Sequence, residues 1–316
     1  MQTRSNGKQV VKAALTPVAS DLPAQRKCLG LAAHSAAFAC HKCNYAFKEL
    51  PSNPFKQDFT NFDDDEWALR SNSTHRANAY KWKSASTSTE AKKLVKANGT
   101  RWSSLLRLSY FDPIRFAPID VMHNCYLGVA KRMMLSAWRG EGGPVSSNEE
   151  PRITKQELNE MASSMEGLTL PYGYDIGALK REITAGDGFS NMKADEWRVF
   201  ILALSPFLLS MRLNARLLVH WMLFVEANKY LGSACISLEE VDTMHTLLKQ
   251  FLQEFKYVYQ DQGLLTINSH NLLHIKNGIL DYGPAMSHWL FNFERYNSDL
   301  KAFNVNKNKI KSEMFY

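Results

Sequence analysis

Two cysteines have the spacing of metal ligands. Cys40 and Cys43 stand in a Cys-x-x-Cys arrangement, but two thiolates fill only half of a tetrahedral zinc shell. The sequence has no second such motif, so further ligands must come from distant residues. His270 and His274 are spaced so that, on a helix, both imidazoles point to one side and can share a metal ion. The other residues that could complete the site are His34, His41, His75 and Cys125. A buried thiol pair without metal is the alternative.

A second pair of residues suits proton transfer. Asp120 and His123 lie within one helical turn of each other. A carboxylate beside a histidine can orient the imidazole, which can then transfer protons or assist a metal site. The alternative is a helix-capping Asp and a core His, and the spacing alone favours that alternative.

Two more carboxylates, Asp21 and Glu294, each lie at the edge of an apolar segment. Brought together, two or three such groups could hold a pair of magnesium ions for phosphodiester chemistry, although nothing in their spacing forces them together. Glu294 is surrounded by aromatic residues, which fits either a cation ligand or a surface Glu on an amphipathic helix. These neighbours are Trp289, Phe291, Phe293 and Tyr296. The sequence has no P-loop, dinucleotide-binding, serine-hydrolase or kinase motif.

The composition indicates a globular protein of one large or two ordinary domains. The 316 residues are 45% apolar, and the formal charge of +7 is compatible with a nucleic-acid partner. An odd count of five cysteines does not fit a secreted disulfide framework. We find no signal peptide, and the longest apolar runs are too short for a membrane span. We therefore expect an intracellular, reducing location.

The pattern of apolar residues predicts many helices and few strands. Capping signals at Thr154 with Glu157 and at Ser237 with Glu240, together with helical periodicity, predict helices over 154–165, 193–213, 217–231 and 237–259. A further helix is expected over about 73–96. Gln9–Ser20 reads as a buried strand or a short helix and is the one good candidate for a strand, and Asp21 after it could cap the next helix. A lone strand has no sheet to join. We expect it to pair with a partner, or with strands that precede residue 1.

Four blocks of the sequence together resemble eukaryotic CACTA-type (En/Spm-like) DDE transposases, of the kind abundant in fungal genomes. The blocks follow the family's order and span nearly the whole chain. They are Asp21-Leu-Pro-Ala-Gln-Arg-Lys27 with Gly30, His34-Ser35 and Cys40-His-Lys-Cys43; Asn98-Gly-Thr-Arg-Trp-Ser-Ser-Leu-Leu-Arg-Leu-Ser-Tyr-Phe-Asp-Pro113; Ile119-Asp-Val-Met-His-Asn124 with Leu127-Gly128; and Asp281-Tyr-Gly-Pro284 with Trp289 and Phe293-Glu-Arg-Tyr-Asn297.

The resemblance implies an α-dominated α/β fold in which a partial RNase H-like core, lacking its first strands, is interrupted by a large all-helical insertion. Residues 1–39 would belong to the core, and 40–104 would hold the Cys-x-x-Cys motif and a polar insert. Residues 105–262 would form the insertion domain, and 263–316 would carry the His pair and the helix of the catalytic Glu.

The resemblance also assigns roles to the acids. Asp21 would be the second catalytic Asp and Glu294 the final Glu, both ligands of Mg²⁺ or Mn²⁺. Asp120 and His123 would be the D-x-x-H element that accompanies the triad. The intact ancestor would carry out DNA transposition by metal-dependent cleavage and strand transfer. Its first Asp would lie before residue 1, so we expect a truncated copy that is inactive as a nuclease.

A more distant relative, the V(D)J recombinase, implies a ligand set for zinc. It has a zinc site made of a C-x-x-C after the second Asp and two His before the Glu. By this parallel, Cys40, Cys43, His270 and His274 are the preferred structural zinc site. A zinc ion there would tie together the two ends of the insertion and position the acids.

The partners that the resemblance implies are DNA, in the form of transposon ends, and a second copy of the chain. The site of action would be the nucleus, without a membrane. Basic residues of the insertion would contact phosphates, and we name Lys131, Arg132, Arg212 and Arg216. One alternative is a non-catalytic DNA- or protein-binding remnant of a transposon. Another is a chain whose incomplete sheet leaves an edge open to aggregation.

Overall fold

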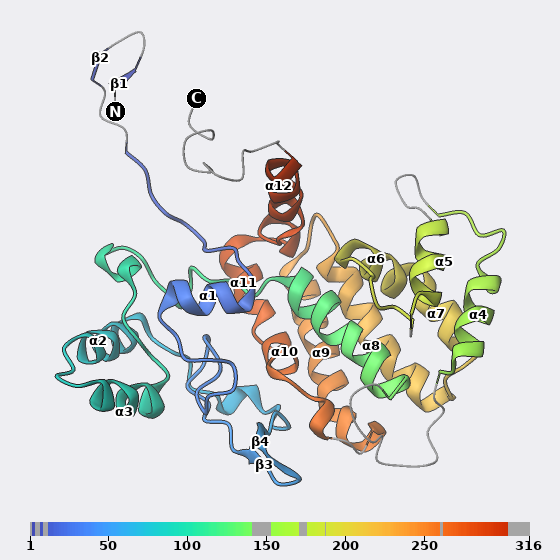
Figure 1. Cartoon of the computed structure of the whole chain (residues 1–316), viewed down its shortest axis with the longest axis horizontal. Helices are drawn as coiled ribbons and strands as arrows, with labels where there is room; N and C mark the ends of the chain where they lie inside the picture. Colours follow the sequence, from blue (N-terminus) through green and yellow to red (C-terminus); the bar gives the residue numbers. More distant parts are fainter. Residues whose placement is uncertain are drawn as a thin grey trace. The chain divides into compact units, whose positions relative to one another are not determined.

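The fold of this chain is dominated by α-helices, as the sequence predicted. The computed structural model describes residues 2–3, 7–8, 12–140, 153–170, 176–186, 188–259 and 262–302 (Figure 1). Strands in these residues form two antiparallel sheets of two strands each. The chain divides into two compact units. Unit 1 comprises Met1–Lys48 and Asp65–Pro118, and unit 2 comprises Glu49–Asp64 and Ile119–Tyr316.

Unit 1 is built from short helices with clear capping residues. Asp21 caps α1 through its side chain, which accepts a hydrogen bond from the Ala24 N–H, and Gly30 ends the helix in the left-handed conformation. The small apolar core includes Leu29, Leu31 and Phe111. The elements of unit 1 are β1 (Gln2–Thr3), β2 (Gly7–Lys8), α1 (Leu22–Leu29), α2 (Asn72–Lys83), α3 (Ser88–Asn98) and η2 (Ser104–Arg107), and η1 (Asp64–Glu66) lies at the boundary of the two units.

Two predictions for unit 1 need correction. The strand expected over Gln9–Ser20 is not formed in its described part, since residues 12–20 have no regular structure. The Val18 N–H donates a hydrogen bond to the Phe116 carbonyl, but among the described residues no neighbouring strand offers a ladder of hydrogen bonds. The single helix expected over 73–96 is two helices, because the Ser/Thr-rich stretch 84–87 ends α2 and Thr87 caps α3.

Unit 2 is a bundle of helices around the paired helices α8 and α9 (Figure 1). Edge-on aromatic contacts fill its centre, such as Trp138 against Trp221, whose ring centroids are 5.0 Å apart. The predicted capping box Thr154–Glu157 is confirmed at the start of α4. The elements are β3 (Glu49–Leu50), β4 (Asn53–Gln57), η3 (Met122–Ala130), η4 (Met133–Trp138), α4 (Lys155–Ser164), α5 (Ile176–Thr184), α6 (Ala194–Val199), η5 (Phe200–Leu204), α7 (Ser205–Ser210), α8 (Ala215–Leu231), α9 (Leu238–Tyr259), η6 (Gln262–Leu264), α10 (Ile267–Leu272), α11 (Ile275–Tyr282), η7 (Ala285–Ser287) and α12 (Phe291–Ala302).

The π-helix η3 and the helix α10 lie against each other in unit 2. Gly128 makes this approach possible, because a Cβ atom at this position would lie 2.4 Å from Nδ2 of Asn268. The Asn124 side chain donates a hydrogen bond to the Asn268 carbonyl at 3.0 Å. The helix that carries His123 and the helix that carries His270 are therefore held together by the close approach of Asn268 to Gly128 and by the hydrogen bond from Asn124. Among the helices that the structure describes, none has the length and apolar character that a membrane crossing requires.

Candidate functional site

Asp120 connects two segments of unit 2 that are distant in sequence. Its carboxylate is 5% exposed and precedes η3. One oxygen, Oδ1, accepts a hydrogen bond from the Leu290 N–H at 2.9 Å, directly before α12. The other, Oδ2, accepts from the His123 N–H at 2.9 Å and lies 2.6 Å from His123 Nδ1. Asp120 is thus a helix cap, as spacing alone favoured, and it also orients the imidazole and fixes the start of α12.

The imidazole of His123 lies between two carboxylates. Because an ionised carboxylate only accepts hydrogen bonds, Nδ1 donates to Asp120 and Nε2 faces Glu294. The distance from Nε2 to Oε1 of Glu294 is 3.2 Å. Glu294 is 53% exposed on α12, so this Asp–His–Glu site opens to solvent. The arrangement can move a proton between His123 and Glu294, or offer a nitrogen and an oxygen to a divalent cation.

The Cys40–Cys43 turn in unit 1 presents buried sulfur atoms in a fixed geometry. The backbone N–H groups of Lys42 and Cys43 donate to Cys40 Sγ at 3.2 and 3.3 Å. The carbonyls of both cysteines accept hydrogen bonds from Nε of Arg70, at 2.9 and 3.1 Å. Backbone N–H donors to a sulfur stabilise its thiolate form, which is the form that binds a metal.

Two buried cations accompany this turn. Arg26 donates to the carbonyls of Ala32 and Ala39, and Arg70 holds the turn itself. Burial lowers the pKa of Arg26 to about 10, while a thiolate charge at Cys40 raises it, so the guanidinium keeps its charge at neutral pH. Without a metal, the hydrogen bond to Cys40 and burial raise the pKa of the Cys43 thiol far above its usual range. A bound cation would remove that penalty, because a metal takes the place of the thiol proton.

In unit 2, His270 and His274 bring two ring nitrogens together. His270 lies on α10 and His274 lies just before α11, so a turn separates them rather than the continuous helix that the spacing suggested. Their Nε2 atoms are nevertheless 3.1 Å apart, and both side chains are buried. Two nitrogens bound to a tetrahedral zinc at about 2.0–2.1 Å lie about 3.3 Å from each other. The His pair therefore has nearly the separation that a shared zinc ion requires.

Cys40 and Cys43 in unit 1, and His270 and His274 in unit 2, are all buried, and these two thiols and two imidazoles are donors that could hold a metal ion such as zinc. This is the ligand set that the sequence analysis preferred. The alternative ligands have other surroundings. His34 is exposed, while His41 and His75 bond to the carbonyls of Ala117 and Leu29. Burial lowers the pKa of His75 to about 4 and raises that of Cys125.

The remaining predicted site residues are placed as follows. Asp21 caps α1 with Oδ1, and its second oxygen makes no hydrogen bond to a described residue. Arg132 donates to the carbonyls of Gly263 and Leu264, and Arg212, whose side chain is 5% exposed, donates to that of Leu208. These bonds favour structural roles for both arginines. Lys131 is half-buried and Arg216 is exposed, which keeps both accessible to phosphate to different extents.

Sequence reasoning missed the residues that hold the cysteine turn. Arg26 lies within the first block of the resemblance, as does the Cys-x-x-Cys motif, and this shared block could have identified it. Arg70 lies outside the four blocks of the resemblance, and no local sequence pattern predicts that its guanidinium is buried. Such long-range hydrogen bonds to backbone carbonyls follow from the tertiary structure.

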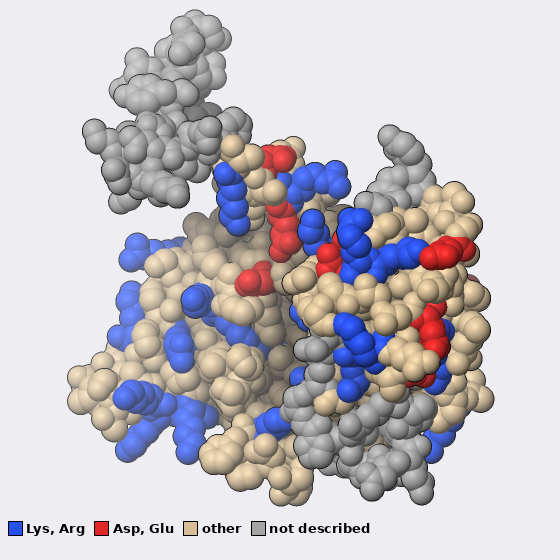
Figure 2. All heavy atoms as spheres, turned by 45° about the vertical axis from the view of Figure 1, so that its right-hand side comes forward, with Lys and Arg blue, Asp and Glu red and all other residues tan. Residues whose placement is uncertain are grey.

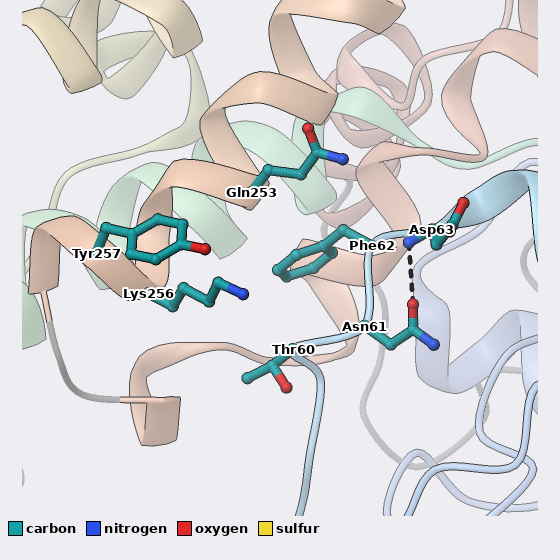
Figure 3. Close-up of a pocket in the computed structure, with 7 residues that line it drawn as sticks. All are labelled: Thr60, Asn61, Phe62, Asp63, Gln253, Lys256 and Tyr257. Carbon is teal, nitrogen blue, oxygen red and sulfur yellow. Dashed lines mark hydrogen bonds between the residues drawn. The ribbon is translucent and has the colours of Figure 1, made fainter.

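A separate groove of about 490 Å³ lies in unit 2 between α9 and the segment 60–63 (Figure 3). Lys256 and Tyr257 face this segment from α9, and Asn61 accepts a hydrogen bond from the Asp63 N–H. The lining includes none of the metal-binding candidates or the Asp–His–Glu residues.

Comparison of the chain with known proteins gave no match to a family model, to a curated protein or to a solved structure.

Proposed function

We propose that this chain derives from a CACTA-type DDE transposase and binds DNA in the nucleus. The observation that carries the proposal is the contact between Asp120–His123 and Leu290–Glu294. About 170 residues separate these two segments, and each belongs to a block that the resemblance links to the catalytic centre. A resemblance that arose by chance gives no reason for the two blocks to share hydrogen bonds.

The carboxylates fit the role of cation ligands. Glu294 is exposed and directed by His123, and Asp21 keeps one carboxylate oxygen without a hydrogen bond to described residues. When bound by such acids, Mg²⁺ or Mn²⁺ ions activate water, and later a DNA 3′-hydroxyl, for attack on phosphodiesters. His123 then acts as a positioning residue, because its Nε2 faces one oxygen of Glu294 and Asp120 fixes its ring. An RNase H-like arrangement of the core around these acids is part of the proposal.

The second part of the proposal is a structural zinc ion bound by Cys40, Cys43, His270 and His274. Two thiolates and two neutral imidazoles make a complete tetrahedral shell, which is typical of structural rather than catalytic zinc. Each pair is arranged for a cation within its own unit, since backbone N–H groups point at Cys40 Sγ and two Nε2 atoms face each other. The buried charges of Arg26 and Arg70 further favour thiolates.

The catalytic part is tested by nicking of supercoiled plasmid with Mg²⁺ or Mn²⁺. The 316 residues supply two of the three acids that the resemblance implies, so we expect no metal-dependent nicking. Nicking that is retained in Asp299→Asn, an exposed control on the same helix, and lost in Glu294→Gln would contradict this expectation.

A non-catalytic, DNA-binding remnant is the second candidate, favoured by the formal charge of +7. Measuring how tightly the variants Asp21→Asn and Glu294→Gln bind duplex DNA distinguishes this remnant from a descendant of a catalytic transposase. If both variants bind DNA as the wild type does, and if no divalent cation binds at Asp21 or Glu294, the result supports the non-catalytic remnant.

A further inference from the structure

The positive charge of this protein is concentrated in one segment of unit 1. Residues 72–107 contain eight Lys and Arg residues and one acid, Glu90, a formal charge of +7. The whole chain also carries +7, from 38 basic and 31 acidic residues. The other 280 residues therefore carry 30 charges of each sign and are neutral overall. The segment includes α2, α3 and η2.

Seven of the eight cations are exposed. The exception, Arg76, is half-buried and donates hydrogen bonds to the carbonyls of Leu106, Leu108 and Phe111. The exposed seven, which we call the basic hairpin, are Lys81, Lys83, Lys92, Lys93, Lys96, Arg101 and Arg107. In the lower left of Figure 2, blue spheres gather with hardly any red among them.

No ion pair to a described residue neutralises the basic hairpin. Its one acid, Glu90, bonds to the Ser86 N–H at the start of α3. Nζ of Lys83 lies 4.1 Å from the ring centroid of Trp102, and that ring packs at a tilt against Tyr80, with the centroids 4.8 Å apart. This contact fixes one ammonium group beside two aromatic rings and leaves its charge uncompensated.

The geometry suits an extended polyanion. Helices α2 and α3 pack on each other and are joined by a short linker, so their charges belong to one rigid element. Lys92 and Lys96 are one turn apart on α3, about 6 Å along the helix. The linker and the start of α3 add the hydroxyls of Ser84, Ser86, Ser88 and Thr89, which are common partners of phosphate oxygens.

Other anionic partners fit less well. A membrane surface requires large apolar side chains that can insert beside the cations. The exposed large apolar side chain within residues 72–107 is Tyr80, whose ring packs at a tilt against Trp102. An acidic protein partner needs an apolar centre inside a charged rim, and Tyr80 alone is too small to form one.

We propose that the basic hairpin binds the phosphate backbone of duplex DNA without reading its sequence. The choice of DNA as the polyanion rests on the proposed function, while the surface itself follows from charge and exposure. The basic hairpin includes none of Lys131, Arg132, Arg212 and Arg216, the residues named above for phosphate contacts.

The test uses the full chain, zinc-loaded, and a fluorescein-labelled 30-base-pair duplex of arbitrary sequence. Fluorescence anisotropy gives Kd between 50 and 300 mM KCl. Seven phosphate contacts predict a slope of log K against log salt of about −6. The variant with Lys81, Lys92, Lys93 and Lys96 all changed to Gln should have a slope about 3 to 4 shallower and bind at least about 100-fold more weakly at 100 mM KCl.

The matched control removes four other exposed lysines, Lys12, Lys48, Lys56 and Lys229, and so makes the same change in net charge. It should keep the wild-type slope. Thermal unfolding checks that both variants fold, since exposed substitutions of this kind shift stability by less than about 0.5 kcal/mol.

An unchanged Kd and slope in the basic-hairpin variant, or an equal loss in the control, would overturn the proposal while leaving DNA binding by the chain intact. Equal or tighter binding to vesicles containing phosphatidylserine would overturn the choice of DNA. If no divalent cation binds at Asp21 and Glu294, the proposed descent from a DDE transposase fails. The slopes of log K against log salt for the wild type and the variant are unaffected by that result.

Discussion

At the scale of single residues, Cys43 and the pair His270 and His274 have features that a bound cation would account for. Cys43 keeps its proton when no metal is bound, because its hydrogen bond to Cys40 and burial raise its pKa. The Nε2 atoms of His270 and His274 face each other at 3.1 Å, where one proton or one cation must separate them. A zinc ion would satisfy both requirements, which is why we propose it for these four side chains.

Zinc content should depend on members of both pairs. We expect about one zinc per chain by elemental analysis of the purified protein, and loss of that zinc in Cys40→Ser and in His274→Ala. Cys28→Ser is the matched control, because Cys28 is exposed and outside the group. Zinc that is retained in His274→Ala would move the site to other ligands.

The affinity for zinc should also fall with pH. The raised pKa of Cys43 means that metal binding releases a proton, so each unit of acidification should weaken binding up to about tenfold for each proton released. Competition with a chelator at pH 6, 7 and 8 measures this. An affinity that is constant across this range would contradict thiolate ligation.

At the scale of elements, close contacts set where the functional side chains lie. Gly128 lets η3 and α10 approach, and Asp120 ties the start of η3 to the residue before α12. In the segment 49–64, Asp64 contacts α9 through Lys249 at 2.6 Å and His245 at 2.9 Å. These contacts hold elements that are distant in sequence.

Replacing Gly128 by Ala should lower the free energy of unfolding by about 1–3 kcal/mol, because the new methyl group would overlap the Asn268 side chain. The double variant with Asn268→Ala should recover part of this loss. Gly232→Ala is the control, since its nearest neighbour would be at an ordinary 3.4 Å. Urea denaturation measures all four proteins. Equal losses at Gly128 and Gly232, or no recovery in the double variant, would argue against the close contact.

Asp64→Asn should destabilise the protein at neutral pH and not in acid. Burial alone raises the pKa of this carboxyl, but the hydrogen bond from Lys249 and the charge of His245 outweigh burial and lower it. A lowered pKa contributes stability above the unfolded value of about 3.9, and this contribution is lost as the pH falls through the folded value. We expect a loss of about 1–2 kcal/mol at pH 7.

Urea titrations of Asp64→Asn at pH 7 and pH 3 measure this difference. The exposed neighbour Asp63→Asn, which should cost less than about 0.5 kcal/mol, is the control. A difference between wild type and Asp64→Asn that persists undiminished at pH 3 would contradict the assignment.

The sequence predicts those elements whose signals are local. Thr154 with Glu157, and Ser237 with Glu240, form the expected hydrogen bonds at helix starts because capping needs only neighbouring residues. The strand over Gln9–Ser20 was wrong in its described part because a strand depends on partners elsewhere in the chain. The break between α2 and α3 was missed, although the run of Ser and Thr at 84–89 carried a signal for it.

The candidate site could be predicted only in part. Ligand types and spacing identify the cysteines and histidines, and the resemblance supplies Asp120, His123 and Glu294. The hydrogen bond from the Leu290 N–H to Asp120, and the burial of Arg26 and Arg70, depend on contacts across many residues. No periodicity in one sequence encodes such contacts.

At the scale of the whole molecule, the ligands of the proposed zinc ion are far apart in the sequence, since Cys40 and Cys43 precede His270 and His274 by about 230 residues. A cross-link between positions separated by about 230 residues restricts the unfolded chain by about 5 kcal/mol in the chain-entropy model. Such a zinc cross-link would restrict the segments that carry Asp21 and Glu294, two acids that belong to different units.

The most direct test of the catalytic descent is iron-induced cleavage of the polypeptide. Fe²⁺ can take the place of Mg²⁺ at carboxylate sites, and with ascorbate and peroxide it produces hydroxyl radicals that cut the backbone nearby. We predict cuts near Asp21 and near Glu294 that Mg²⁺ or Mn²⁺ suppresses. Both cuts should disappear together in Asp21→Asn and in Glu294→Gln, and remain in Asp299→Asn. Cleavage at neither position, or cuts near Glu294 that persist in Glu294→Gln, would contradict a shared metal site and with it the proposed DDE origin of this chain.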